Sequence, residues 1–169
     1  DLRVHAELPW ANTLFGTFDR AFSFHASKPL CGKRPPEAPG PATARPFAWR
    51  SYGTVRDRVK VFAKGLHGLM AQAGLGADVG VAVMAQNSEE WMVACFSCWC
   101  LGRAVVAVAT TTAMVQLPAV LRQGNAQVLI TDRTDITLPN LAVLITIAAA
   151  RADSAAAAAS SFDSVELSG

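Results

Sequence analysis

Apolar and polar residues alternate along this 169-residue chain with periods that change from segment to segment. Residues 54–73 carry an apolar side chain at every third or fourth position, which predicts an amphipathic helix with Thr54 as its N-cap. A shorter aromatic pattern over residues 14–24 predicts another helix, capped by Asn12 or Thr13. We expect both helices to pack their apolar stripe against the rest of the protein.

Residues 28–46 hold six prolines, which predicts an exposed loop. Short strand-like segments flank this loop, Leu30–Gly32 before it and Phe47–Tyr52 after it. Successive side chains in a strand point to opposite faces, so Phe47 and Trp49 are expected on one face. The sequence therefore predicts a β-hairpin with a long tip.

Apolar runs at residues 79–84 and 104–108 predict short strands that are buried on both faces, and residues 127–131 predict a third strand. Helical segments at 91–101 and 116–123 separate them. Asn87 and Glu90 resemble a capping box before the first helix, while Gly102 and the Gly124–Asn125 pair end the two helices. The fold class is therefore α/β, with a partial parallel sheet, flanking helices and a β-α-β-α-β core joined by right-handed crossovers.

The end of the sequence is less regular. Residues 141–147 predict one more strand, and 162–167 another short element. The Ala-rich stretch 148–160 between them is expected to be a flexible or weakly helical loop. The whole chain is divided into a helix and hairpin (1–53), an α/β core (54–147) and an Ala-rich loop with a terminal element (148–169).

Composition narrows the possible functions. The chain is 51% hydrophobic and 17% charged, which argues against disorder, and its net charge of +2 gives no reason to expect a nucleic-acid partner. No apolar run reaches the roughly 18 to 20 residues that span a bilayer, so membrane contact is expected to be peripheral or to come from a part outside this sequence. The basic run Arg56, Arg58 and Lys60 is interpreted as a solvated helix face.

The cysteines and histidine do not form a metal site by spacing. Cys95, Cys98 and Cys100 interrupt an apolar helix, and Cys31 lies far from them. A zinc site would need further ligands nearby, so we interpret the triplet as small buried side chains in a reducing compartment. His67 lies beside the helix stripe without a partner at ligand spacing, and a surface position is expected.

Catalytic candidates are few. Asp132 follows a predicted strand, where ligands of α/β proteins bind, but a turn or cap role is favoured. Gly32-Lys33 lacks the earlier glycine of a phosphate-binding loop, and Thr110-Thr111-Thr112 lacks neighbouring glycines and a lysine. Hydrolase, zinc-protease and dinucleotide motifs are also missing. The sequence therefore assigns no catalytic, cofactor-binding or metal-binding residue.

The segments that carry a family resemblance are Thr13-Leu14-Phe15, Lys28-Pro29-Leu30-Cys31-Gly32, Phe47-Ala48-Trp49-Arg50-Ser51-Tyr52-Gly53, Ala63-Lys64-Gly65-Leu66, Gly80-Val81-Ala82-Val83, Asn87-Ser88-Glu89-Glu90-Trp91, Leu101-Gly102-Arg103-Ala104-Val105-Val106, Ala126-Gln127-Val128-Leu129-Ile130-Thr131-Asp132, Leu138-Pro139-Asn140-Leu141 and Ser161-Phe162-Asp163-Ser164-Val165-Glu166. In this order they resemble the opening of long-chain fatty-acyl-CoA synthetases, members of the AMP-binding, adenylate-forming superfamily. Ala77-Asp78-Val79 departs from the resemblance, standing where a Gly-Asp-Arg-like turn is usual, and the Ala-rich tail is unusual too.

The resemblance implies an acid–thiol ligase as the parent protein. It would use ATP and Mg²⁺ to form an acyl-adenylate from a fatty acid, and coenzyme A would then displace AMP. The family's Ser/Thr/Gly-rich loop with its lysine comes later in the chain and is absent here, so this piece alone is expected to be inactive. An intracellular location is expected, either cytoplasmic or peripheral on the endoplasmic reticulum or peroxisome. The alternatives are a non-catalytic α/β binding or scaffold module, and part of an aryl- or amino-acid-adenylating enzyme.

Overall fold

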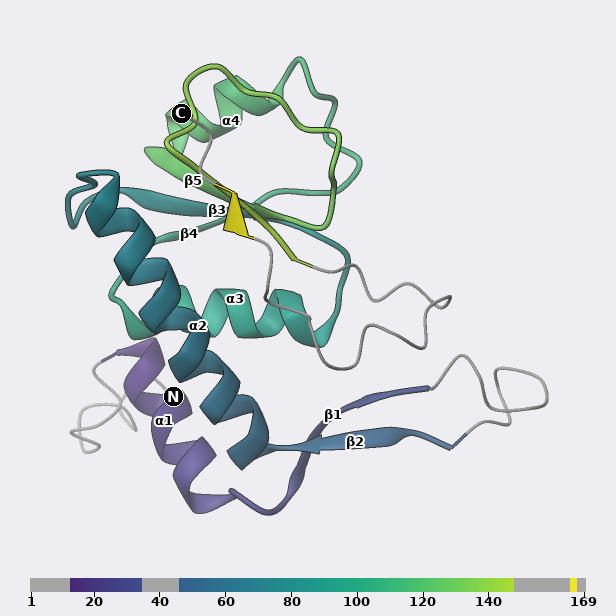
Figure 1. The fold of residues 1–169 in the computed structure, drawn as a ribbon. Helices are drawn as coiled ribbons and strands as arrows, with labels where there is room; N and C mark the ends of the chain where they lie inside the picture. Colours follow the sequence, from purple (N-terminus) through teal and green to yellow (C-terminus); the bar gives the residue numbers. More distant parts are fainter. Residues whose placement is uncertain (1–12, 35–45, 148–164, 167–169) are drawn as a thin grey trace, which may run out of the picture. The chain divides into compact units, whose positions relative to one another are not determined.

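The computed structural model describes residues 13–34, 46–147 and 165–166. The chain divides into two compact units, residues 1–60 and 61–169, each of which is described by itself. Figure 1 shows the order of the elements, from α1 and a hairpin through a long helix to a mixed α/β unit. The predictions made for 148–160, and for most of 162–167, lie outside the described residues.

The first unit contains helix α1 (Leu14–Phe24) and a two-stranded sheet of β1 (Pro29–Lys33) and β2 (Ala48–Ser51). Thr13 is the N-cap of α1, because its side-chain oxygen accepts a hydrogen bond from the backbone N–H of Gly16 at 2.9 Å. The two strands are antiparallel. The predicted aromatic helix and hairpin are both confirmed.

Helix α2 (Tyr52–Gln72) begins earlier than the sequence pattern indicated. The prediction that Thr54 caps it was wrong, since Ser51 Oγ accepts the backbone N–H of Thr54 at 3.2 Å and so fills that role. The helix ends as predicted at Gly74, whose φ of +65° is the left-handed conformation that glycine adopts without strain. The next residue, Leu75, donates its backbone N–H to Met70 O at 2.9 Å, which completes a Schellman turn.

The second unit is built on a five-stranded sheet with the order β4-β3-β5-β6-β7. Strands β3, β4 and β5 are parallel, as the sequence predicted, the further strand β6 is also parallel to β5, and β7 is antiparallel to β6. The strand bounds are β3 (Gly80–Met84), β4 (Val105–Ala107), β5 (Ala126–Thr131), β6 (Val143–Thr146) and β7 (Val165–Glu166).

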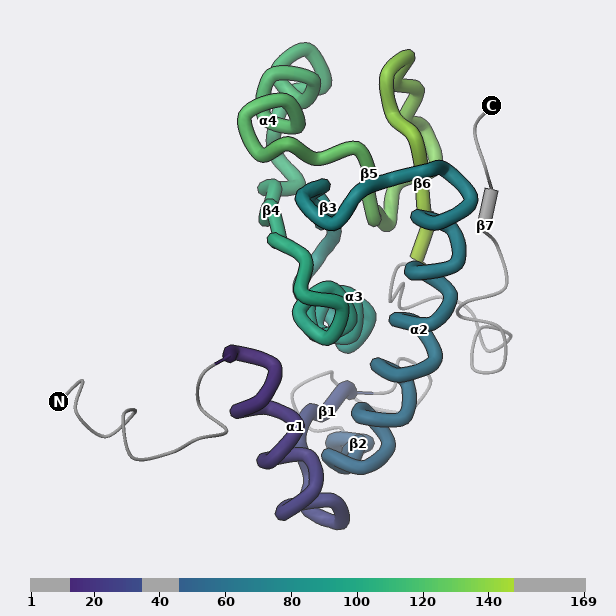
Figure 2. Tube along the Cα trace, turned by 90° about the vertical axis from the view of Figure 1, so that its left-hand side faces the viewer, coloured from purple at the N-terminus to yellow at the C-terminus, as the bar shows by residue number. Residues whose placement is uncertain are grey.

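Helices cover both faces of this sheet. Helix α3 (Glu89–Cys100) and the second half of α2 pack on one face of the sheet. There Leu66 and Met70 of α2 belong to the same cluster of buried side chains as Val81 and Val83 of β3. Helix α4 (Leu117–Gln123) packs on the other face, around Leu117 and Leu121. Figure 2 shows α3 and α4 on opposite sides of the sheet. No helix in the described part of the chain is long and apolar enough to cross a membrane.

The N-terminus of α3 differs from the expected capping box. Ser88, not Asn87, is the N-cap, and its side chain accepts the backbone N–H of Trp91 at 3.1 Å. Asn87 is therefore outside the helix, and Glu90 lies in the first turn rather than at the third helical position. Its charge still favours the helix start, because the first turn carries the positive end of the helix dipole.

Replacing Gly102 or Gly65 by alanine should change the free energy of unfolding in opposite directions. Gly102 ends α3 at φ +66°, whereas Gly65 lies within α2, and neither would bring a Cβ within 4 Å of another group. Gly102→Ala should lower the free energy of unfolding by about 1 kcal/mol, since only backbone conformation is penalised. Gly65→Ala should raise it by about 0.5 to 1 kcal/mol by restricting the unfolded chain. Urea unfolding measures both, and a loss for Gly65→Ala would contradict the assigned helix.

Candidate functional site

The carboxyl edge of the parallel sheet is the place where α/β proteins bind ligands. The chain passes from β3 to β4 on one side, then crosses to form β5 on the other side of β3. Strand order therefore reverses beside β3, between its end at Met84 and the end of β5 at Thr131. This switch point is the candidate site that the topology defines.

Asp132 lies at this switch point and bridges it. Its Oδ2 atom accepts a hydrogen bond from the backbone N–H of Gln86 at 3.0 Å, which links the segments that follow β5 and β3. A carboxylate that is held by a backbone donor stabilises a turn. The structure thus supports the cap role that sequence favoured for Asp132, because its side chain connects two strand ends.

The next charges along this edge are paired with each other. Arg133 donates from Nε and Nη2 to the two carboxylate oxygens of Asp135, at 2.9 and 2.6 Å. The hydrogen bond from Arg133 lowers the pKa of the Asp135 carboxyl, which is exposed, whereas the Arg133 side chain is partly exposed. Thr131 Oγ1 also accepts the backbone N–H of Arg133 at 3.1 Å. These side chains hold the loop in shape through contacts within the loop itself.

The remaining phosphate-loop candidates belong to different units of the chain. Thr110, Thr111 and Thr112 form a turn after β4, closed by the backbone N–H of Thr112 and the carbonyl of Ala109 at 2.9 Å. Gly32 and Lys33 belong to the β1–β2 hairpin of the first unit, where Gly32 lies opposite Trp49. Neither set has the glycine-rich backbone and lysine that hold phosphates.

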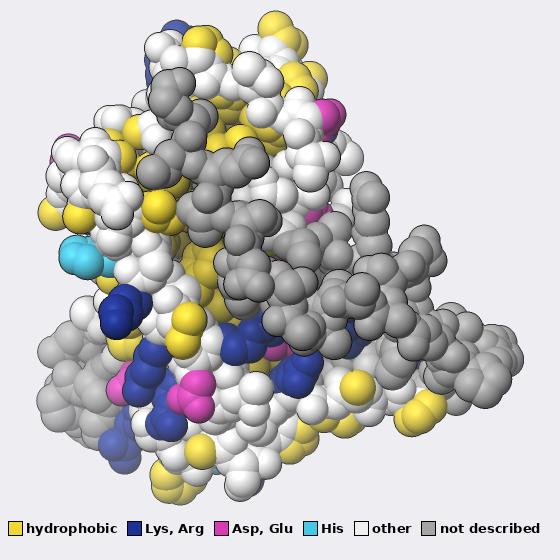
Figure 3. Space-filling model, in the orientation of Figure 1, with side chains coloured by type: hydrophobic (Ala, Val, Ile, Leu, Met, Phe, Trp, Pro, Cys, Tyr) yellow, Lys and Arg dark blue, Asp and Glu magenta, His cyan; other side chains and the backbone are white. Residues whose placement is uncertain are grey.

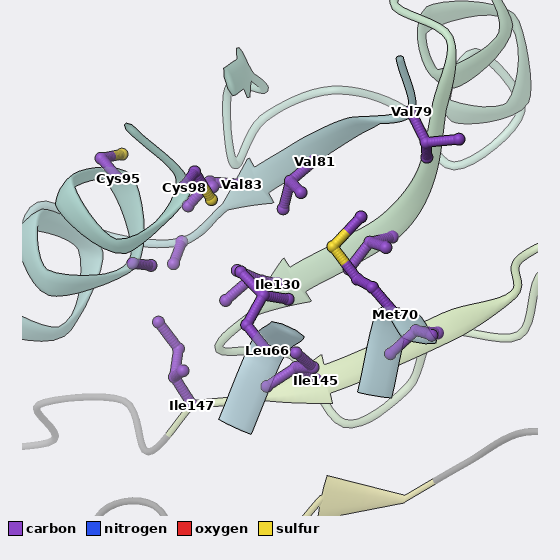
Figure 4. Close-up of a cluster of buried hydrophobic side chains, with 14 residues drawn as sticks. Leu66, Met70, Val79, Val81, Val83, Cys95, Cys98, Ile130, Ile145 and Ile147 are labelled. Atoms are coloured by element: carbon purple, nitrogen blue, oxygen red, sulfur yellow. The ribbon is translucent and has the colours of Figure 1, made fainter. Parts of the chain in front are cut away.

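Two of the three α3 cysteines, Cys95 and Cys98, are buried in the core as the sequence indicated, whereas Cys100 is only partly buried. Figure 4 shows Cys98 near Val83, with Cys95 on the same helix. Burial raises the pKa of Cys95 to about 11, and burial together with the neighbouring Cys95 raises the pKa of Cys98 to about 12. Among the described residues, no three His, Cys, Asp or Glu side chains are grouped so that they could hold a metal ion.

The histidine and basic candidates lie on a helix surface. His67 is exposed on α2, as expected. Figure 3 shows Lys and Arg side chains over α2 with acidic groups among them, and Asp57 lies 3.6 Å from Arg56 Nε. Lys60 is exposed as expected of a solvated helix face, whereas Arg56 and Arg58 are partly buried and the Nε atom of Arg56 is buried, so the interpretation holds for only part of the basic run.

A hollow of about 270 Å³ lies at the opposite, amino edge of the sheet. Sequence reasoning missed it, because its wall joins the end of α4 to the loop before β6 and no local spacing indicates that contact. Among the described residues that line it, Arg122 alone is charged, and it is exposed. The lining consists of Pro118, Leu121, Arg122, Asn125, Ala126, Gln127, Leu138, Pro139, Asn140 and Leu141.

The bridge across the switch point can be tested by removing its acceptor. Asp132→Ala should lower the free energy of unfolding by about 1 kcal/mol, because the backbone N–H of Gln86 loses its charged partner. Asp132→Asn keeps an oxygen acceptor and should lose less. Asp135→Ala is the control and should leave stability nearly unchanged, since exposed ion pairs contribute little. Equal losses in the two alanine variants, measured in urea, would contradict a bridging role for Asp132.

The buried thiols should be chemically protected. At pH 8 a disulfide reagent should label Cys31 and Cys100 in the folded protein, and Cys95 and Cys98 only after denaturation, because the thiolate is the reactive form. The raised pKa values stabilise the fold fully below about pH 9, and this contribution should be lost as pH rises towards 11 to 12. Rapid labelling of all four thiols in the native state, read by mass spectrometry, would contradict this assignment.

Comparison with known proteins agrees with this architecture. The model of the AMP-binding enzyme family matches residues 33–167. Rat long-chain-fatty-acid–CoA ligase 6 (Rattus norvegicus) is 27% identical over 135 residues, and the matched part covers 80% of this chain. It covers only 17% of that ligase, so the chain spans about a sixth of the length of this curated relative.

Solved structures share the fold. The anthranilate CoA ligase AuaEII in complex with anthranoyl-AMP matches with a TM-score of 0.63 and 20% identity, over 85% of this chain and 26% of that one. CmiS6 matches with a TM-score of 0.64 and 17% identity, over 80% of this chain and 30% of that one. At these identities the likeness carries the fold alone. Because the family model matches most of this chain, the chain belongs to the AMP-binding enzyme family.

Proposed function

We propose that this chain is the N-terminal α/β part of a long-chain fatty acid–CoA ligase. Such an enzyme activates a fatty acid with ATP through an acyl-adenylate and then forms the coenzyme A thioester. The observation that carries the proposal is the similarity to the rat ligase, which extends over 135 residues of this chain. The mouse long-chain-fatty-acid–CoA ligase 5 (Mus musculus) adds to it, with 26% identity over 122 residues.

Within that enzyme, this part serves as scaffold. Bound ATP and Mg²⁺ would need a phosphate-holding loop and free acidic oxygens. At the carboxyl edge of the sheet, Asp132 Oδ2 accepts the backbone N–H of Gln86 and Asp135 pairs with Arg133, so these two carboxylates serve the loops. The sequence also holds no Ser/Thr/Gly-rich loop with a lysine. We therefore assign the contacts to ATP, Mg²⁺ and coenzyme A to other parts of the enzyme.

The proposal is tested with the complete reading frame that encodes this sequence. The purified product should release pyrophosphate when palmitate is added, and should form palmitoyl-CoA once coenzyme A is present. Benzoate, anthranilate and free amino acids serve as competing substrates in parallel reactions. Pyrophosphate release and thioester formation, followed by coupled assay and mass spectrometry, should both favour palmitate.

Each alternative has its own outcome. Activity with an aryl or amino acid but not with palmitate would overturn the fatty-acid assignment while keeping the adenylating family. A reading frame without a phosphate-binding loop would favour a non-catalytic scaffold module. The 169-residue chain alone is the matched control and should form no palmitoyl-CoA. Thioester formation by that control would contradict the scaffold role.

A further inference from the structure

The hollow at the amino edge of the sheet lies wholly within the second unit. Its wall is formed by α4, the start of β5 and the turn that precedes β6. Its volume of about 270 Å³ is just below the roughly 300 Å³ at which pockets for drug-sized ligands begin. The hollow is open to solvent, because Arg122, Gln127 and Asn140 in its wall are exposed. A small organic molecule can therefore enter it.

The floor of the hollow is aliphatic. Leu121 and Ala126 are buried in the core on the α4 side of the sheet, and Leu138 and Leu141 pack against that core. None of the described residues that line the hollow is aromatic. An alkyl group that covers this floor gains free energy by leaving water, whereas an aryl ring finds no ring on which to stack. The lining therefore favours a ligand with an aliphatic body.

Hydrogen bonds hold the strand that forms part of this wall. Asn125 Nδ2 donates to the carbonyl of Asp78 at 3.1 Å, and the backbone N–H of Gly80 donates to the carbonyl of Asn125 at 2.9 Å. On the other side, the backbone N–H of Ala142 donates to the carbonyl of Gln127 at 3.0 Å. The start of β5 is thus tied to the segments that begin β3 and β6. Because the wall is held in place without a ligand, binding does not need to order this part of the chain.

One positive charge lies in the wall. Arg122 is the charged residue among the described residues that line the hollow, and that lining contains no Asp or Glu. No carboxylate in the described part of the chain pairs with its guanidinium. A guanidinium presents its donors in a planar fork that matches the two oxygens of a carboxylate. The exposed amide groups of Gln127 and Asn140 can donate further hydrogen bonds from the same lining.

We propose that the hollow binds a short aliphatic carboxylate, whose charged end pairs with Arg122 and whose alkyl body covers the leucines of the floor. Acetate or inorganic phosphate would gain the charge pair without the apolar contact, and an alkylamine would meet a like charge. The inference goes beyond the proposed function, because it adds a second ligand at the sheet edge opposite the switch point.

The charge pair and the alkyl body set the size of the expected effects. Arg122 is exposed, so Arg122→Gln should weaken binding by about fivefold, as expected of an exposed charge pair. Each methylene removed from the ligand should weaken binding by up to about fourfold. Affinity should therefore rise from butanoate to hexanoate and level off once the alkyl body fills the hollow. Adsorption on an open surface would instead keep rising with chain length.

The test is a titration of the 169-residue chain with sodium hexanoate, followed by two-dimensional NMR of the backbone amides. Saturable shifts should be confined to residues 121–127 and 138–142, with a Kd of about 1 mM. Hexanol has the same alkyl body without the charge and should bind about fivefold more weakly. Hexylamine should bind more weakly still, because Arg122 repels its charge.

Variants of the chain supply matched controls. Gln127→Phe adds a ring at an exposed strand position in the lining and should block binding, whereas Gln123→Phe adds the same ring at an exposed position outside the lining and should not. Lys64→Gln removes an exposed cation on α2 and is the control for Arg122→Gln. Circular dichroism checks the fold of each variant. The exposed Arg122→Gln change keeps the test valid if Gln127→Phe perturbs β5.

Absence of saturable shifts up to about 20 mM hexanoate would overturn the proposal, since that concentration is far above the expected Kd. Equal affinity for hexanol and hexanoate, or equal losses in Arg122→Gln and Lys64→Gln, would also overturn it. Tighter binding of benzoate than of hexanoate would contradict an aliphatic ligand. Palmitoyl-CoA formation by the complete enzyme is measured separately, so failure of the proposed function leaves the result of this titration unchanged.

Discussion

The burial of β3 on both of its faces is the constraint on which the α/β unit depends. Val81 and Val83 enter one core cluster, Ala82 and Met84 enter the other, and all four are fully buried. A strand without a polar face must be covered by helices on both sides, and its backbone must be paired along both edges. Strands β4 and β5 supply that pairing, while α3 and α4 cover the faces. The topology follows from the apolar character of this strand.

The same arrangement makes the carboxyl edge a structural joint. Because β3 lies between β4 and β5, the loops after β3 and β5 come together, and Asp132 binds the backbone at Gln86. The neighbouring Arg133 and Asp135 satisfy each other. The polar groups that could attract a ligand are thus used to shape the loops. This agrees with the scaffold role proposed for the chain.

Local sequence predicted helices and strands well where the physical signal was strong. The apolar runs gave the parallel strands, and the glycines gave two helix ends, because only glycine adopts the left-handed backbone of Gly74 and Gly102 without cost. The capping residues predicted for the starts of α2 and α3 were wrong. Ser51 and Ser88 are the capping residues in place of Thr54 and Asn87, since several neighbouring side chains can accept the same backbone N–H. The spacing of polar residues alone cannot choose among them.

The sequence by itself determined the α/β class, the parallel core, the structural role of the α3 cysteines and the family resemblance, because each rests on local periodicity or on residue order. Only the tertiary structure decided what distant segments form together. The bond from Gln86 to Asp132 joins residues 46 apart, and the hollow joins α4 to the loop before β6. The packing of Trp49 on Gly32 likewise needed the strand register. These contacts depend on how strands pair and helices pack, which no short window of sequence encodes.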